Sequence, residues 1–192
     1  MRDVIVAGDP SLAAFGIAAV AKGWDMRMER VRFRTLGCSL EKRATEREKT
    51  LRLVRLARDF RAAAIYYGAT SVWLEDLPTH GVYGVVGLAE LRGVLRVEME
   101  EAGIPVHFVQ APQARRLLYG RQPPRGLTQS QRKAWLLEPL RLAGLSLDDD
   151  AQADAFCVAN YALSELGSPC LAHILGTPEL KPKAKRMRKV AA

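Results

Sequence analysis

The sequence is poor in the side chains that most often form disulfides or bind zinc. Its 192 residues include three histidines and three cysteines, Cys38, Cys157 and Cys170. The cysteines are widely spaced and no CxxC pair occurs, which disfavours a disulfide framework and a structural zinc site. This cysteine usage is typical of a reducing compartment, so we expect a cytoplasmic protein.

Long apolar runs are also lacking. No run approaches the length of a membrane span, and the first residues, MRDVIV, show no secretory cleavage pattern. With 48% hydrophobic and 26% charged residues, the composition is that of an ordinary globular protein. We expect one domain over residues 1–176, long enough for a substantial core, and a basic, disordered tail over residues 177–192.

Two segments contain no acidic residue. Residues 181–192 carry six Lys and Arg, which supply most of the formal net charge of +8 and suit non-specific phosphate binding. Residues 111–135 contain further basic side chains, with Tyr119 and Trp135 between them and Gly and Pro breaking the middle. Such a segment is typical of binding to a nucleic-acid backbone, the alternative being an exposed loop of no special role. Its basic residues are Arg115, Arg116, Arg121, Arg125, Arg132 and Lys133.

The hydrophobic pattern predicts an α/β protein with a five-stranded sheet flanked by helices. Residues 4–21 form a hairpin whose first strand is apolar on both faces, as in the centre of a sheet. Residues 25–35 alternate charged and apolar side chains, which indicates an edge strand. Two further strands are expected over 70–74 and 104–109. Helices are expected from Ser39 to about residue 67, over 85–102, on both sides of a loop within 111–135, and over 151–166.

Two of the buried strands end in carboxylates. Asp9 follows the first strand, and Glu75 with Asp76 follows the strand over 70–74. A carboxylate at the end of a buried strand is costly unless something compensates it. Asp9 alone is compatible with a turn that caps a backbone N–H. The alternative is a metal ligand at the carboxyl ends of the strands, where open α/β sheets place their sites.

A third group of carboxylates lies at the start of the last helix. Asp148, Asp149 and Asp150 complement a helix N-terminus, but that role leaves Asp154, one turn further, unexplained. Asp150 and Asp154 are four residues apart and share one face, so a divalent cation between them would offset their repulsion. Oxygen ligands of this kind suit Mg²⁺ or Mn²⁺, and paired ions of this type hydrolyse phosphodiesters. The candidate catalytic and metal-binding set is Asp9, Glu75, Asp150 and Asp154.

Four short motifs, taken in order, resemble the RuvC family of Holliday junction resolvases over roughly residues 3–166. They are Gly8-Asp9-Pro10-Ser11, Leu74-Glu75-Asp76, Leu91-Arg92-Gly93 and residues 153–159, ADAFCVA; Ala111-Pro112 with Arg115 and Tyr119-Gly120 also matches. The resemblance implies an RNase H-like fold and a homodimer. It also implies nicking of opposing strands of four-way DNA junctions that depends on two Mg²⁺ or Mn²⁺ ions per site and leaves 5′-phosphates.

The resemblance assigns Asp9, Glu75 and Asp154 to metal-ligand positions. The family usually has a fourth ligand three residues before the last one, where this sequence has Ala151. Asp150 is our candidate for that role because a spacing of four keeps the helix face, and Asp149 is the reserve.

The DNA contacts implied by the resemblance follow the basic segment. Members of the family often carry an aromatic wedge after the strand-end Glu; Pro78 lies near that place here, and Tyr83 is the nearest aromatic. The DNA-binding candidates are therefore Arg115, Arg116, Tyr119, Arg121, Arg125, Arg132, Lys133 and Tyr83. For the dimer, the helix over 85–102 carries more apolar side chains than one sheet face consumes, among them Val86, Val94 and Val97.

Two other classes of function are compatible with the sequence. Another RNase H-like nuclease, acting on forks, flaps or structured RNA, would use the same carboxylates. A protein without catalytic activity would be either a junction binder with a decayed site or an actin-like nucleotide-binding domain. The first would lack carboxylates that are present here, and the second needs a second Gly-rich phosphate loop and a longer chain.

Overall fold

A computed structural model describes residues 3–23, 25, 27–37, 44–77 and 85–172. In these residues the chain forms β1 (Val4–Asp9), β2 (Ala14–Ala21), the 3₁₀ turn η1 (Met28–Arg30), β3 (Arg32–Gly37), α1 (Glu46–Tyr66), β4 (Ala69–Glu75), α2 (Val85–Glu101), β5 (Val106–Val109), α3 (Ala111–Tyr119), α4 (Gln129–Leu142) and α5 (Asp150–Glu165). None of the described helices is long and apolar enough to cross a membrane.

The strands make one mixed sheet in the order β3-β2-β1-β4-β5. β1 pairs antiparallel with β2 and parallel with β4, while β3 and β5 lie at the two edges. The predicted five-stranded sheet and hairpin are thus confirmed. The charged edge strand is present as β3, but it begins at Arg32, after the turn η1, and not at Asp25. Because β1 and β4 are parallel neighbours, their carboxyl ends lie side by side at the same end of the sheet.

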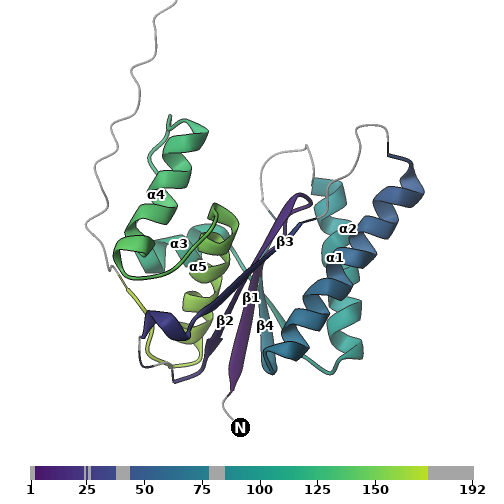
Figure 1. The fold of residues 1–192 in the computed structure, drawn as a ribbon, viewed down its shortest axis with the longest axis horizontal. Helices are drawn as coiled ribbons and strands as arrows, with labels where there is room; N and C mark the ends of the chain where they lie inside the picture. The colour runs from purple at the N-terminus through teal and green to yellow at the C-terminus, as the bar shows by residue number, and fades with distance from the viewer. Residues whose placement is uncertain (1–2, 24, 26, 38–43, 78–84, 173–192) are drawn as a thin grey trace, which may run out of the picture.

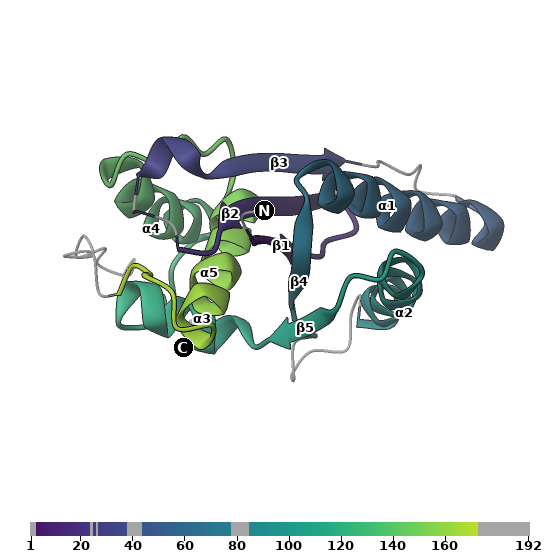
Figure 2. The ribbon, with the colours of Figure 1, turned by 90° about the horizontal axis from the view of Figure 1, so that it is seen from below.

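Helices cover both faces of the sheet, with α1 and α2 on one face and α3, α4 and α5 on the other (Figure 1). Alternation along β1 divides its side chains between the two layers: Ile5 and Ala7 join the core under α5, and Val6 joins the core under α1. This two-sided burial explains why β1 is an almost uninterrupted apolar run. α5 lies over β1 and β2, which the view of Figure 2 also shows.

The first helix begins later than the sequence predicted. α1 starts at Glu46 with Thr45 as its N-cap, and Ser39 lies outside the described residues. Thr45 and Glu48 form a capping box: the Thr45 Oγ1 accepts from the Glu48 backbone N–H at 3.3 Å, and a Glu48 carboxylate oxygen accepts from the Thr45 N–H at 2.6 Å. The reciprocal bonds satisfy donors that would otherwise be exposed at the helix end. The capping box predicted at Thr128 and Gln131 is confirmed at the start of α4.

A missing side chain lets α5 approach the sheet closely. Gly16 pairs with Asp9 across the hairpin, and a Cβ atom at Gly16 would lie 2.0 Å from the Ala151 carbonyl oxygen. Any larger residue would therefore push the first turn of α5 away from β2. Gly16 thus places the start of α5 directly beside the end of β1.

Candidate functional site

Three partly buried carboxylates converge at the carboxyl ends of β1 and β4. In the parallel register Gly8 lies opposite Leu74, so that Asp9 and Glu75 are the next residues on neighbouring strands. Asp154 reaches the same place from the second turn of α5, which packs on β1. The side chains of Glu75 and Asp154 are only 21% and 13% exposed. The structure thus brings together the three carboxylates that the sequence grouped, and their role in binding metal stays a prediction.

Burial raises the pKa of all three carboxyl groups. The pKa of Asp9 rises well above its ordinary value of 3.8, first through burial and then through the negative charges of Glu75, Asp154 and Asp150. Burial and the charge of Asp154 raise the pKa of Glu75 to about 7. Burial also raises the pKa of Asp154, against the opposing effect of Arg115. These acids share a water-poor space and need nearby cations to be ionised together.

Arg115, from α3, is the cation that lies among them. Its Nε donates a hydrogen bond to Asp154 Oδ1 at 2.8 Å. Its Nη2 forms an ion pair with the same oxygen at 2.8 Å and lies 3.8 Å from Glu75 Oε2. The Arg115 side chain is 22% exposed, so the pairing takes place largely out of water. Burial acts to lower the pKa of Arg115, but the negative charges of Asp154 and Glu75 outweigh it and raise the pKa, so the side chain stays charged.

The structure separates the two candidates for a fourth ligand. Asp149 is the N-cap of α5: its Oδ1 accepts from the Gln152 backbone N–H at 2.9 Å, and its Oδ2 accepts from the Thr35 hydroxyl at 2.8 Å. Asp150 is the first residue of α5 and pairs with Lys133 Nζ at 2.8 Å. Its charge raises the pKa of both Asp9 and Asp154. Asp150 therefore lies near enough for its charge to act on Asp9 and Asp154, while both oxygens of Asp149 are engaged in structural bonds.

A second network, which the sequence gave no reason to expect, fixes the end of β4. Asp76 accepts hydrogen bonds from Arg92, from the Leu77 backbone N–H at 2.8 Å and from Gln110 Nε2 at 2.9 Å. The Arg92 guanidinium lies 3.8 Å above the centre of the Phe108 ring. Asp76 is thus held by α2 and by the residue before α3, and it orients the strand end that carries Glu75.

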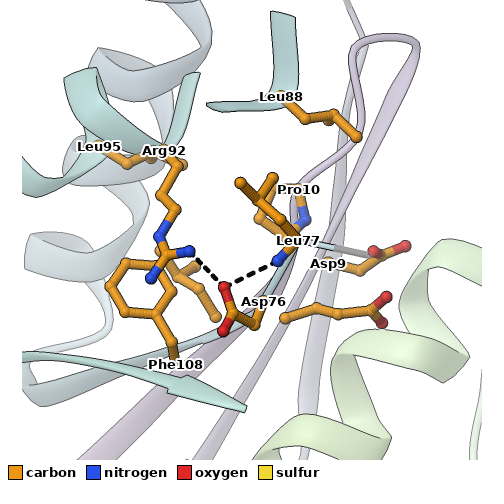
Figure 3. A pocket seen from close by; sticks show the side chains of 10 residues that line it. Asp9, Pro10, Asp76, Leu77, Leu88, Arg92, Leu95 and Phe108 are labelled. Atoms are coloured by element: carbon orange, nitrogen blue, oxygen red, sulfur yellow. Dashed lines mark hydrogen bonds and ion pairs between the residues drawn. The ribbon is translucent and has the colours of Figure 1, made fainter. Parts of the chain in front are cut away.

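This network borders a cavity of about 190 Å³ beside the carboxylates. Figure 3 shows Asp9 on one side of the cavity and Arg92, stacked on Phe108, on the other. The described residues that line it are Asp9, Pro10, Leu74, Glu75, Asp76, Leu77, Leu88, Arg92, Leu95 and Phe108. Asp9 and Glu75 therefore border both the cavity and the cluster beneath α5.

The basic segment divides into an exposed part and a buried part. Arg116, Arg121, Arg125 and Arg132 are exposed. Tyr119, in contrast, is 3% exposed, packs against Trp135 and donates its hydroxyl hydrogen to the Leu136 carbonyl at 2.8 Å. Tyr119 is therefore a core residue and is not placed to touch DNA.

Two further predictions fall outside the described residues. Tyr83 and the tail over residues 177–192 lie there, so the proposed wedge and the phosphate-binding tail stay predictions.

The donor set fits a hard divalent cation. Apart from Arg115, the side chains that converge offer only carboxylate oxygens, which Mg²⁺ and Mn²⁺ prefer. Among the described residues, no three His, Cys, Asp or Glu side chains have the arrangement of a formed metal site. Arg115 and Lys133 instead hold Asp154 and Asp150.

No protein-family model and no curated protein matches this sequence. Solved structures do match in fold. The chain is similar to a RuvC structure from Thermus thermophilus, with a TM-score of 0.59 and 18% identity. It is also similar to T. thermophilus RuvC in complex with a Holliday junction substrate, with a TM-score of 0.63 and 17% identity. Each comparison covers 86% of this chain and 97% of the other. The predicted RNase H-like fold is confirmed.

The buried acids predict a pH dependence of the metal-free protein. Between about pH 4.5 and 7 the unfolded chain has released protons that the folded cluster still holds, so the free energy of unfolding falls as the pH rises. Glu75→Gln should remove part of this slope and stabilise the protein at neutral pH by about 1–3 kcal/mol. Urea unfolding in EDTA measures both effects. Glu138→Gln, an exposed change on α4, should keep the wild-type slope; equal slopes in all three proteins would contradict the prediction.

Proposed function

We propose that this protein is a metal-dependent endonuclease that resolves four-way DNA junctions by paired nicks on opposing strands. The observation that carries the proposal is the convergence of Asp9, Glu75 and Asp154 from three separate segments into one partly buried cluster. Burial of like charges at this cost is typical of functional sites rather than of cores. The structural likeness to RuvC, one example of which is bound to a Holliday junction substrate, supports the choice of DNA junctions.

In this proposal Asp9, Glu75, Asp150 and Asp154 hold the divalent ions. When bound, such ions activate a water molecule and stabilise the leaving oxygen of a phosphodiester. The protein positions the carboxylates from rigid elements: two adjacent strand ends and the first turns of one helix. The Asp76–Arg92 pair holds the strand end behind Glu75, so that the ligand geometry is set before substrate binds.

The DNA backbone would lie across α3, α4 and the loop between them. Arg116, Arg121, Arg125 and Arg132 are exposed there, beside the site, and all carry positive charge. Contacts of this kind position a nucleic acid and make its binding salt-dependent, while leaving sequence unread. We therefore propose recognition of junction shape, with incision leaving 5′-phosphates.

Paired nicks on a two-fold symmetric junction require two sites in matching orientation, which a homodimer supplies. The outer face of α2 suits that role. Val86 and Val97 are 71% and 59% exposed, and nothing lies within 4 Å of a Cβ atom built at Gly93 between them. A shallow groove there is lined by Gly93, Arg96, Val97, Glu100 and Glu101, and its mixed charges allow a self-complementary contact. A second copy can thus approach α2 closely at Gly93.

The first test of the proposed function concerns the carboxylates of the cluster. Asp9→Asn, Glu75→Gln and Asp154→Asn should each abolish cleavage of a synthetic four-way junction in Mg²⁺. Junction binding should persist, because phosphate contacts dominate affinity. Gel assays of cleavage and mobility shift measure the two separately, and Asp59→Asn, an exposed carboxylate on α1, is the matched control.

Substrate competition tests the choice of DNA structure. The wild type should prefer the four-way junction over a fork, a flap, a linear duplex and an RNA duplex. Preference for forks, flaps or structured RNA, with the same carboxylates required, would assign the chain to another RNase H-like nuclease. Cleavage that survives any of the three substitutions would overturn the site itself.

The second prediction separates the neighbouring acids of α5. Asp150→Asn should lower cleavage at least about tenfold, roughly 1.4 kcal/mol of barrier, because Asp150 lies near enough for its charge to act on Asp9 and Asp154. Asp149→Asn should do much less, since Asn also caps helices. A higher Mg²⁺ concentration, or Mn²⁺, should partly restore Asp150→Asn. Single-turnover rates decide the matter; a larger loss in Asp149→Asn would move the ligand assignment to that residue.

The third prediction concerns the dimer. Light scattering at about 10 μM should give the mass of a dimer for the wild type, and Val97→Glu should shift it towards the monomer by burying a charge in the contact. Ile65→Glu, on α1, is a control of similar exposure, 56% against 59%, and should stay dimeric. A monomeric wild type would refute the α2 interface.

A further inference from the structure

Each carboxylate that α5 contributes to the cluster is paired with a cation from the neighbouring basic segment. Asp154 pairs with Arg115 of α3, and Asp150 pairs with Lys133 of α4. The two pairs differ in burial: the Arg115 and Asp154 side chains are 22% and 13% exposed, while Lys133 and Asp150 are 47% and 34% exposed. Arg115 therefore lies within the proposed metal site, and Lys133 lies at its exposed margin.

A metal ion bound to Asp154 Oδ1 would compete with Arg115 for that oxygen. Asp154 Oδ1 already accepts a hydrogen bond from Arg115 Nε at 2.8 Å and lies 2.8 Å from Nη2, and the guanidinium lies 3.8 Å from Glu75 Oε2. A divalent ion binds carboxylate oxygen at about 2.0–2.6 Å, so an ion on Oδ1 would compete with the guanidinium for that oxygen, and its charge would repel the guanidinium. With neither cation present, buried carboxylates would repel one another without compensation.

We infer that Arg115, and to a smaller extent Lys133, are exchangeable counter-ions: they neutralise the carboxylates in the metal-free protein and are displaced when a divalent ion binds. This inference rests on the proposed metal site. On metal binding, two positive side chains would move away from the carboxylates. They belong to the basic segment in which Arg116 and Arg132 are already exposed. Once released, Arg115 and Lys133 are available to DNA phosphates.

The exchange couples metal binding to DNA binding. Without the metal, a phosphate that recruits Arg115 has to break the pair with Asp154 and leave that carboxylate uncompensated. With the metal bound, this cost is absent. Binding of the metal therefore increases affinity for DNA, and by reciprocity DNA increases affinity for the metal.

The test measures binding of Ca²⁺ to the DNA-free, full-length protein by isothermal titration calorimetry. Arg115→Met removes the competing cation and keeps most of the side-chain volume, so Ca²⁺ should bind about tenfold more tightly than to the wild type. Arg116→Met is the control: it removes a positive charge from the next residue, whose side chain is exposed. It should change the affinity for Ca²⁺ less than about twofold. Lys133→Met should fall between these two, because its pair is more exposed.

Two arrangements keep the result interpretable. The titrations are done well above the pKa of Glu75 and in two buffers of different ionisation enthalpy, so that protons released by the acids are counted separately. Arg115→Lys keeps the charge but loses the paired N–H contacts, and its affinity should lie between those of the wild type and Arg115→Met. In EDTA, the thermal unfolding temperature of Arg115→Met should be lower than that of the wild type. Adding Ca²⁺ should raise the unfolding temperature of Arg115→Met more than that of the wild type.

The outcomes separate the inference from the proposed function. Unchanged or weaker Ca²⁺ binding in Arg115→Met, or an equal gain in Arg116→Met, would overturn the inference and leave the metal site intact. A wild type that binds no divalent ion, or binds it equally well after Asp9→Asn, would overturn the metal site as well. Should Arg115→Met fold only with Ca²⁺ present, the Arg115→Lys and Lys133→Met affinities still decide the matter.

Discussion

Like charges forced together out of water are the constraint around which this structure is arranged. Asp9, Glu75 and Asp154 repel one another, and burial raises the pKa of each. A stable protein keeps such a cluster only if something compensates it. In the metal-free chain Arg115 supplies the compensation, at 2.8 Å from Asp154.

The rest of the fold holds these charges in place. The parallel pairing of β1 and β4 aligns two strand ends, and the absence of a side chain at Gly16 lets α5 deliver Asp154 to the same point. Asp76, bound by Arg92 and Gln110, prevents the end of β4 from relaxing away from the repulsion. Packing and hydrogen bonds on both sides of the sheet thus offset the electrostatic repulsion among the carboxylates.

Local patterns explain why so much of this could be predicted from the sequence. A strand that is buried on both faces is visible in the sequence as an apolar run, and the ends of two such runs located Asp9 and Glu75. The spacing of Asp150 and Asp154 indicated the face of α5 that carries them. The start of α1 was wrong because Ser39 and Thr45 are both capping residues, although only Thr45 has Glu48 three positions later. Tyr119 was assigned to the surface from its basic neighbours, yet it follows Leu118 on the buried side of α3. The pairing of Arg115 and Lys133 with α5 could not be predicted, because it depends on how α3 and α4 pack against that helix.

The central claim, that the buried carboxylates form one divalent-metal site, is tested most directly by crystals of the protein grown with Mn²⁺. The account predicts an anomalous scattering peak among the carboxylates of Asp9, Glu75 and Asp154, with the Arg115 guanidinium moved away from Asp154. Peaks only elsewhere on the molecule, with Arg115 still bound to Asp154, would contradict it.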